Sequence, residues 1–260
     1  MRIIISPAKK MNADPDSLPW GDLPCFLPQT ERLLETLRGM DGQVLQALWR
    51  CNDRIAALNR ERLAHMDLRR GLTPAVLAYE GIQYRYMAPQ VFTDREFAYV
   101  QEHLRILSGF YGVLRPLDGV TPYRLEMQAK LAVGEARDLY AFWGDTLAGS
   151  LFDETDCIIN LASREYSRCV TRYRRPGVRV LTCVFGQKQN GRIVERGTAC
   201  KMARGEMVRF LAENRAEDPE ALQAFTRLGY RFDPARSDGE TWVFVRGDGE
   251  DPPDSPAEVW

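Results

Sequence analysis

Two short apolar runs, each followed at once by polar residues, place the strongest constraint on the fold of this chain. Residues 2–6 contain three consecutive isoleucines and are stopped by Pro7. Residues 157–161 repeat the pattern with Ile158 and Ile159. A short continuous apolar run bounded by turn residues is typical of a buried strand. Both runs therefore predict central strands that lead into polar loops.

Helical patterns alternate with these strands. Apolar residues recur at helical spacing over residues 28–38, 41–65, 94–107, 198–213 and 220–228. Thr73-Pro74 is typical of a helix start, and further strands are predicted at residues 178–185, 192–196 and 241–245. Asn190-Gly191 predicts a tight hairpin between two of them. Because helices and strands interleave without a repeat, we predict one α/β (mixed α+β) domain over residues 1–246, with a mixed β-sheet flanked by helices.

Composition excludes several classes of protein. The 260 residues are 45% hydrophobic and 10% aromatic, which suffices for a large core and is too apolar for a disordered chain. The sequence has no run of eighteen apolar residues and no secretory signal pattern, so we expect a cytoplasmic protein without a membrane partner. Residues 247–260 hold five acidic residues, three prolines and no basic residue, which predicts a disordered acidic tail.

Cysteine and histidine usage argues against a metal centre. The six cysteines form no CxxC pair and are expected to be free thiols in a reducing compartment. His65 and His103 lie far apart in sequence, in helical patterns, and we interpret both as structural. Walker, dinucleotide-binding, HExxH and GxSxG motifs are all lacking from the sequence. We therefore predict neither a metal site nor a cofactor.

The near-neutral net charge conceals a basic body. Without the tail, 35 basic residues face 31 acidic residues. Residues 164–179 contain six arginines and one acid, and a surface of that charge attracts phosphates. We take Arg164, Arg168 and Arg172 as candidate anion-binding residues. The alternative is a solvated helix face next to a loop.

Lys9 and Lys10 follow the first predicted strand directly. Ligands of α/β sheets bind beyond the carboxyl ends of strands, and a lysine there is suited to phosphate. The alternative for residues 6–10 is an ordinary surface loop.

A longer polar segment covers residues 105–127. Glycines let backbone N–H groups approach a phosphate, and neighbouring arginines can bind it with two hydrogen bonds. Asp118 and Glu126 allow the alternative that they neutralise Arg115 and Arg124 in a structural network. The anion-binding candidates of this segment are Arg105, Ser108, Gly109, Gly112, Arg115 and Arg124.

Two further segments complete the set. Residues 160–166 follow the second predicted strand and contribute Asn160, Ser163 and Glu165, although Ser163 could equally be a helix cap. Lys201 and Arg204 lie three residues apart on one helix face near the helix start, where the dipole favours an anion. A solvated face is the alternative for this pair.

Taken together, these segments resemble the YaaA family of peroxide-stress proteins. The resemblance rests on Ser6-Pro7-Ala8-Lys9, residues 104–118, residues 122–127, Leu139-Tyr140, Phe142-Trp143-Gly144, residues 160–163, Glu165-Tyr166, Lys201 and Ala203-Arg204-Gly205. The matches run in order along nearly the whole chain except the tail. Residues 79–84 depart from the family pattern, which carries an aspartate directly after the glycine, so the role of that acid is either lost here or taken by Glu80.

The resemblance implies a fold of the family's own and a role in surviving hydrogen peroxide by limiting iron-dependent oxidative damage. It also implies binding of double-stranded DNA through a positively charged cleft that includes a helix-hairpin-helix element. Our candidate for that hairpin is residues 108–112, where Gly109 and Gly112 stand three apart rather than the usual two.

Two hypotheses remain open. The first is a DNA-binding protein whose phosphate contacts give sequence-independent affinity. The second is an enzyme acting on a small anionic or nucleotide-like substrate, because acids are interleaved with the bases, as general acid–base chemistry requires. Its polar pocket would be built from Asp118, Tyr123, Glu126, Asn160, Ser163 and Glu165. Direct iron binding is a weaker third hypothesis, since no facial-triad spacing is present.

Overall fold

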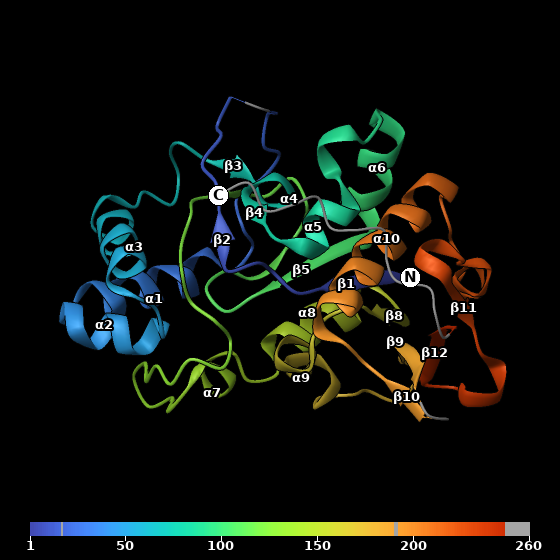
Figure 1. Ribbon diagram of the computed structural model, residues 1–260. Coiled ribbons are helices and arrows are strands. Elements are labelled where there is room, and N and C mark those ends of the chain that lie inside the picture. Colours follow the sequence, from blue (N-terminus) through green and yellow to red (C-terminus); the bar gives the residue numbers. More distant parts are fainter. Residues whose placement is uncertain (17, 190–191, 248–260) are drawn as a thin grey trace.

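The computed structural model describes residues 1–16, 18–189 and 192–247, and within them a mixed, mostly parallel sheet of eight strands forms the centre of the molecule (Figure 1). Its order is β11-β12-β9-β8-β1-β5-β6, with β10 paired to β9. The strands are β1 (Arg2–Ile5), β5 (Leu104–Ser108), β6 (Gly112–Leu114), β8 (Cys157–Asn160), β9 (Arg179–Gln189), β10 (Arg192–Val194), β11 (Tyr230–Phe232) and β12 (Thr241–Arg246).

Five strands run parallel and the outer ones run antiparallel. β1 pairs in parallel with β5 on one side and with β8 on the other, and β8, β9 and β12 continue the parallel set. β6, β10 and β11 pair antiparallel with β5, β9 and β12. The prediction of a single α/β domain with a mixed sheet is therefore confirmed.

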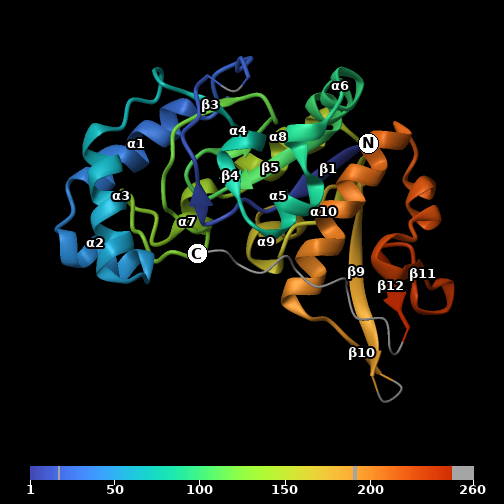
Figure 2. The same cartoon turned by 45° about the horizontal axis from the view of Figure 1, so that its top comes forward.

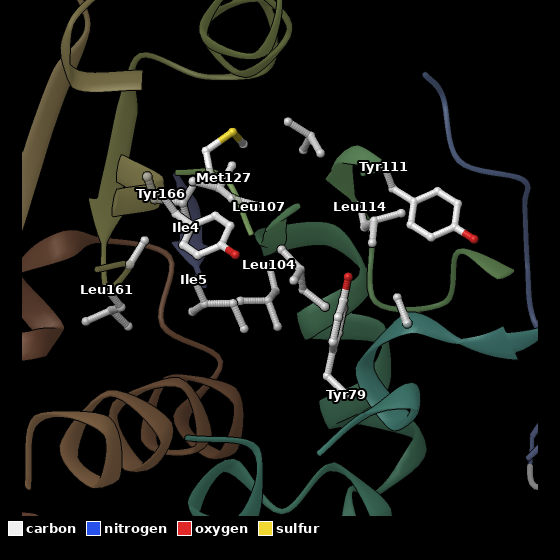
Figure 3. Packing of buried hydrophobic residues seen from close by; sticks show 14 of the residues in the cluster. Ile4, Ile5, Tyr79, Leu104, Leu107, Tyr111, Leu114, Met127, Leu161 and Tyr166 are labelled. Atoms are coloured by element: carbon white, nitrogen blue, oxygen red, sulfur yellow. The ribbon is translucent and has the colours of Figure 1, made fainter. Parts of the chain in front are cut away.

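The core sits around β1 because helices cover both faces of the sheet. Ile3, Ile4 and Ile5 are fully buried, as are Ile158 and Ile159 of β8, which explains why both sequences are apolar without alternation. Figure 3 shows members of this hydrophobic cluster from the central strands and from the segments that follow them. Both predicted central strands are thus confirmed.

Helices pack on the two faces in separate groups. The helices are α1 (Leu27–Arg38), α2 (Gly42–Trp49), α3 (Asp53–His65), α4 (Ala75–Ala78), α5 (Ile82–Met87), α6 (Asp94–His103), α7 (Leu139–Trp143), α8 (Thr146–Glu154), α9 (Arg164–Thr171) and α10 (Gly197–Asn214). α10 packs on α5 and α6, and α6 packs on β1 and β5, whereas α8 and α9 pack together on the other side (Figures 1 and 2). No helix in the described ranges is long and apolar enough to span a membrane.

Two small ladders and four 3-10 turns complete the fold. β2 (Lys10–Met11) pairs with β4 (Tyr79–Glu80), and β3 (Thr73–Pro74) pairs with β7 (Gly119–Val120). The 3-10 turns are Pro89–Val91, Pro219–Ala224, Arg227–Gly229 and Pro234–Arg236. The first ladder ties the loop after β1 to the segment before α5, and this contact shapes the site described below.

Three predicted helices differ from the observed ones. Residues 41–65 form α2 and α3, because Arg50 adopts a left-handed φ of 47° and Asn52 caps α3 by accepting a hydrogen bond from Ile55 N at 3.0 Å. The helix predicted over 94–107 ends at His103, since the apolar residues after it enter the sheet as β5. Residues 220–228 contain only 3-10 turns rather than an α-helix.

The segment proposed as the hairpin of a helix-hairpin-helix element is a β-hairpin. Ser108 and Gly112 are paired residues of the antiparallel strands β5 and β6. Gly112 has a φ of 78°, which a residue with a side chain rarely adopts. The turn residues Phe110 and Tyr111 are fully buried. The assignment of residues 108–112 was wrong because strands, not helices, flank the turn.

Two sequence-based predictions fall outside the described residues. Asn190-Gly191 is one, although the strands on either side of it, β9 and β10, are antiparallel as a hairpin requires. The acidic tail is the other, since all but its first residue, Gly247, lies outside the described ranges.

Candidate functional site

The sheet topology creates a crevice at the carboxyl ends of β1 and β8. The chain leaves β1 towards β5 and leaves β8 towards β9, so the two loops diverge to opposite sides of the sheet. Such a switch point is where open α/β sheets bind ligands. Ser6, directly after β1, accepts a hydrogen bond at its Oγ from Ser163 N at 2.8 Å, and the two hydroxyl oxygens are 3.2 Å apart. The two loops are therefore locked together at the crevice.

A cavity of about 410 Å³ opens at this switch point. It is walled by the loop after β1, the start of α5, the segment 123–126, the start of α9 and the face of α10. Tyr84 on α5 fixes part of the wall, because its hydroxyl donates a hydrogen bond to Ser6 O at 3.0 Å. The polar lining residues are Ser6, Lys9, Lys10, Glu80, Gln83, Tyr84, Tyr123, Arg124, Glu126, Ser163, Glu165, Tyr166, Lys201 and Arg204.

Cations from three distant segments meet in this cavity. Lys9 and Lys10 come from the loop after β1, Arg124 from the central segment, and Lys201 and Arg204 from α10. They are only partly neutralised. Glu126 accepts contacts from Lys9 Nζ at 3.0 Å and Arg124 Nη2 at 3.7 Å, and Glu80 contacts Lys10 at 2.6 Å.

The carboxylates lie among these cations rather than apart from them. Glu165 Oε1 accepts a hydrogen bond from Gln128 N at 3.2 Å. Burial and the nearby negative charge of Glu126 raise the pKa of Glu165 above its ordinary value. The cavity thus holds a carboxyl group that takes up a proton more easily than a free glutamate, which suits proton transfer or the recognition of a hydrogen-bond donor.

A buried tyrosine network forms the floor of the cavity. The Tyr123 hydroxyl lies 2.6 Å from Ser108 Oγ and 2.9 Å from the Tyr79 hydroxyl. Ser108 Oγ also accepts hydrogen bonds from the backbone N–H groups of Phe110 and Tyr111. Ser108 is therefore fully buried and fully engaged, and it contributes to the cavity only by holding Tyr123 in place.

Two buried donors of the cavity wall have no partner. Gln83 is 6% exposed and its Nε2 makes no hydrogen bond, and Arg204 Nε is likewise buried and unpaired. The described residues contain five buried side-chain polar atoms of this kind, and two of them line this one cavity. Buried polar groups in native proteins are normally paired, so these two stand out.

The structure gathers about half of the predicted site residues here. Those lining the cavity are Lys9, Lys10, Arg124, Lys201 and Arg204 of the anion-binding set, and Tyr123, Glu126, Ser163 and Glu165 of the polar-pocket set. Asn160 does not line the cavity, but it shapes the loop after β8, because its Oδ1 accepts a hydrogen bond from Ala162 N at 3.0 Å.

Other predicted residues lie elsewhere. Arg105 is buried away from the cavity, and its Nη2 contacts Glu154 Oε2 at 2.5 Å. Asp118 contacts the backbone of Arg115 rather than its side chain: the Asp118 Oδ2 atom accepts a hydrogen bond from Arg115 N at 2.8 Å. Gly109 and Gly112 belong to the buried β5–β6 turn.

Three of the six arginines in residues 164–179 remain available to bind an anion, and the other three are ion-paired. Arg164, Arg168 and Arg172 are exposed on or just after α9 and have no ion pair within the described part of the chain. The other three arginines of the stretch, Arg174, Arg175 and Arg179, pair with Glu240, Asp153 and Glu220.

Five residues of the site were not among the predicted site residues. Ser6 belongs to a segment that was singled out for its lysines alone. Glu80, Gln83 and Tyr84 lie in residues 79–84, where the signal was the departure from the family pattern and only Glu80 was named, as the acid that could replace the family's aspartate. Tyr166 was part of a matched motif but was given no role, and it is buried against the cavity.

A second cavity, of about 620 Å³, adjoins the first. Lys10, Glu80, Gly81, Ile82 and Tyr84 line both cavities and form the partition between them. The Lys10–Glu80 ion pair of the β2–β4 ladder spans this partition, with Lys10 largely exposed and Glu80 partly exposed.

Histidines and cysteines stay outside the site. The described residues contain no group of three or more His, Cys, Asp and Glu residues arranged to hold a metal ion. His103 is buried in α6, with Nδ1 3.0 Å from Met1 O and its ring stacked on Tyr99. Burial raises the pKa of Cys183 to about 12, so this thiol stays protonated at neutral pH and reacts slowly with oxidants.

Comparison with known proteins identifies the family. The family described as peroxide stress protein YaaA matches residues 1–236. A UPF0246 protein of Agathobacter rectalis is 52% identical over 246 residues, which cover 95% of this chain and 99% of the relative. UPF0246 proteins of Lachnoclostridium phytofermentans and Desulfitobacterium hafniense are 50% and 51% identical, again over 95% of this chain and over 97% and 98% of the relatives. The chain therefore belongs to the peroxide stress protein YaaA family.

Proposed function

We propose that this protein acts in the peroxide response by binding the phosphate backbone of double-stranded DNA, largely without sequence specificity. The observation that carries the proposal is the meeting of Lys9, Arg124 and Lys201, from three distant segments, at one open cavity. Five cationic side chains line that cavity against three acidic ones. Because Lys9 and Lys201 are exposed, they can reach phosphates outside the cavity and release the counterions that phosphates hold.

The helix pair α2–α3 lies next to Arg124. The two helices are joined by residues 50–52 only, and the left-handed Arg50 turns the chain sharply. Arg124 connects this hairpin to the cavity, because its Nε and Nη2 donate hydrogen bonds to Trp49 O at 3.3 and 3.2 Å.

We further propose that coverage of DNA limits iron-dependent damage. Hydroxyl radicals formed from Fe²⁺ and hydrogen peroxide cleave exposed sugars, and a protein that coats the backbone shields them. The wild type should protect a duplex from cleavage by Fe²⁺ and peroxide, whereas Lys9→Ala/Lys201→Ala should protect it less at the same protein concentration. Equal protection by the two proteins would contradict this role.

The salt dependence of duplex binding tests the DNA proposal. The logarithm of the affinity should fall linearly with the logarithm of the salt concentration, with a slope of about −0.9 for each phosphate contacted. Lys201→Ala should weaken binding and reduce the slope by about one unit, and adding Lys9→Ala should reduce it by less than a further unit, because Lys9 is already paired with Glu126. Arg168→Ala/Arg172→Ala tests the exposed arginines on and just after α9 in the same way.

The chain offers a matched control within the same arginine stretch. Arg174 and Arg175 are already paired with Glu240 and Asp153, so Arg174→Ala/Arg175→Ala should leave the slope unchanged. A wild-type affinity that does not vary with salt, or a control that shifts the slope as much as the cavity variant, would refute the proposal.

Catalysis on a small anionic or nucleotide-like substrate is a second candidate function. The position of the cavity at the β1–β8 switch point, with Glu126 and Glu165 inside it, favours this candidate. It predicts saturable binding of a small phosphate ester, abolished in Glu165→Gln. Failure of nucleoside monophosphates, as probes, to raise the melting temperature of the wild type would count against it.

A further inference from the structure

The strand order brings the carboxyl end of β12 to the edge of the sheet where the cavity opens. β12 runs parallel to β9, which runs parallel to β8, and β8 runs parallel to β1. All four strands therefore end at the same edge, and the cavity lies beyond the end of β1. The residues that follow Arg246 leave the sheet on this side rather than on the opposite one.

The residues beyond the described part of the chain carry the charge that the cavity lacks. Residues 248–260, the acidic segment, contain five carboxylates and no lysine or arginine. The family match ends at residue 236, so this segment lies beyond the part of the chain that defines the family. Its acids are Asp248, Glu250, Asp251, Asp254 and Glu258.

Unpaired cations lead from the end of β12 to the cavity. Gln187 of β9 is the register partner of Arg246, which places the exposed Lys188 next to the start of the acidic segment. Arg196 precedes α10 and Lys201 lies on its second turn; both are exposed, and α10 packs on β9 (Figure 2). Lys188, Arg196 and Lys201 make no ion pair within the described ranges, and Lys201 lines the cavity.

The acidic segment is long enough to reach these cations. The strand registers place Thr241 level with Ile4, so Arg246 lies about 17 Å further along the strand direction and about 14 Å to the side. The distance back to the end of β1 is therefore about 22 Å. An extended chain rises about 3.3 Å per residue, so residues 248–260 can span about 40 Å.

We propose that the acidic segment binds back onto this domain, with its carboxylates on Arg196 and Lys201 at the mouth of the cavity. Bound there, it occupies cations that DNA phosphates would contact, and it lowers the affinity for duplex. The contact itself does not depend on DNA, whereas the competition rests on the proposed DNA binding.

The number of charges and the covalent tether favour the bound form. A single exposed ion pair is weak, but here several carboxylates meet several unpaired cations. A short flexible tether keeps the segment at a millimolar effective concentration near the cavity. Weak individual contacts therefore suffice, and salt weakens them by screening.

Carbodiimide coupling of the full chain tests the contact without DNA. The reagent joins a carboxylate to a lysine amine that touches it, and mass spectrometry of the peptides locates each amide bond. We expect the acidic segment to couple to Lys201 at low salt, with a yield that falls about fivefold in about 0.5 M salt. The yield should not change on dilution. A yield that falls with dilution assigns the contact to a second copy of the chain and overturns the proposal.

Two other lysines serve as controls in the same experiment. Lys188 lies next to the start of the acidic segment and should couple wherever the segment goes, which shows that the reagent works. Lys130 is exposed and lies outside both cavities, so it should couple only at background level. Coupling to Lys188 alone, or equal coupling of Lys130 and Lys201, overturns the proposal.

Neutralising the acidic segment tests the competition. The variant keeps the length of the chain and removes its charge by Asp248→Asn, Glu250→Gln, Asp251→Asn, Asp254→Asn and Glu258→Gln. Its duplex affinity should rise about tenfold, as expected for a site that is covered in about nine molecules of ten. With Arg196→Ala/Lys201→Ala also present, neutralisation should raise the affinity by less than about threefold, because the anchors of the segment are gone. A tenfold rise that persists there shows repulsion of DNA at a distance and overturns the competition.

The two proposals fail separately. Coupling to Lys201 in a protein that binds no duplex supports the back-binding and refutes the DNA proposal. Coupling no stronger at Lys201 than at Lys130, in a protein that binds duplex, overturns the back-binding and leaves DNA binding standing. Coupling to Lys201 without any gain in duplex affinity on neutralisation overturns the competition.

Discussion

Ser6 and Ser163 join the two halves of the switch point. Ser6 Oγ accepts a hydrogen bond from Ser163 N at 2.8 Å, across 157 positions of sequence, and both residues line the cavity. The serine at the start of α9 makes no side-chain cap to its own helix, so its hydroxyl is free to face Ser6 at 3.2 Å. The site is thus assembled by tertiary contact rather than by either loop alone.

Ser6→Ala should loosen this junction. The variant loses the acceptor for Ser163 N, and we expect the free energy of unfolding to fall by about 1 kcal/mol. Duplex affinity should fall as well, because Lys9 follows on the same loop. Denaturant unfolding and duplex titration measure the two effects. Ser150→Ala is the control, since Ser150 bonds only within its own helix at Leu147 O; an equal loss of affinity there would contradict the role of the junction.

Glu154→Gln should destabilise the fold without affecting DNA binding. Glu154 Oε2 contacts both Arg105 and Arg2, and Arg105 is 3% exposed, so the variant leaves a buried cation without its counter-charge. We expect a loss of about 3 kcal/mol in the free energy of unfolding. Duplex affinity and its salt slope should be unchanged, and a change in slope would return Arg105 to the anion-binding set.

Acid titration checks the same ion pair. Burial alone would raise the pKa of Glu154, but Arg105 and Arg2 outweigh it and hold the pKa below its ordinary 4.5. A lowered pKa means that the stability contribution is present above pH 4.5 and is lost as the pH falls through the pKa of the folded state. The wild type should lose this part of its stability in acid, and Glu154→Gln should not.

Asp118 should give the opposite pH dependence. Burial raises the pKa of its carboxyl from 3.8 to about 7, so the folded protein favours the protonated form. Its stability contribution is full below pH 3.8 and is lost as the pH rises through 7, by up to about 4 kcal/mol. Asp118→Asn keeps the acceptor for Arg115 N. It should remove this pH dependence from the free energy of unfolding, measured in unfolding curves between pH 4 and 8. Parallel curves for the two proteins would contradict the shift.

Gly205→Ala should separate α5 from α10. The added methyl group would meet the backbone of Gln83 and Met87, and relief requires the helices to move apart. We expect a loss of about 1–3 kcal/mol in the free energy of unfolding. Gly197→Ala is the matched control in the same helix, because a Cβ there meets nothing within 4 Å. Thermal unfolding compares the two, and equal melting temperatures would show that the close contact does not matter.

The central strands and the loops that follow them were predictable from local pattern. Uninterrupted isoleucine runs ending in polar residues indicated β1 and β8, and the polar residues after them pointed to the cavity. Because ligands of open α/β sheets bind beyond the strand ends, polar residues at these positions can be assigned to a binding site from the sequence. The two serines of the junction show the limit of this rule. Ser163 was predicted as a site residue, whereas Ser6 was not, because only the lysines that follow it were considered.

The errors have a common physical cause, which is that sequence patterns do not reveal tertiary partners. Arg105 was indistinguishable from a surface arginine until β5 placed it in the sheet beside Glu154. Gly109 and Gly112 permit several kinds of turn, and only the pairing of β5 with β6 selects the β-hairpin. Gln83 has no chemical signature in sequence, because its unpaired amide exists only where α10 covers α5.

The partition between the two cavities rests on little free energy. Lys10 is largely exposed and Glu80 partly exposed, and an ion pair of this kind contributes about 0–1 kcal/mol. Thermal motion therefore suffices to part them. The side chains can therefore separate at the rim while the β2–β4 backbone ladder, with Gly81, Ile82 and Tyr84, still divides the hollows of about 410 and 620 Å³, so a guest in either hollow meets a charged rim that yields above a wall that does not.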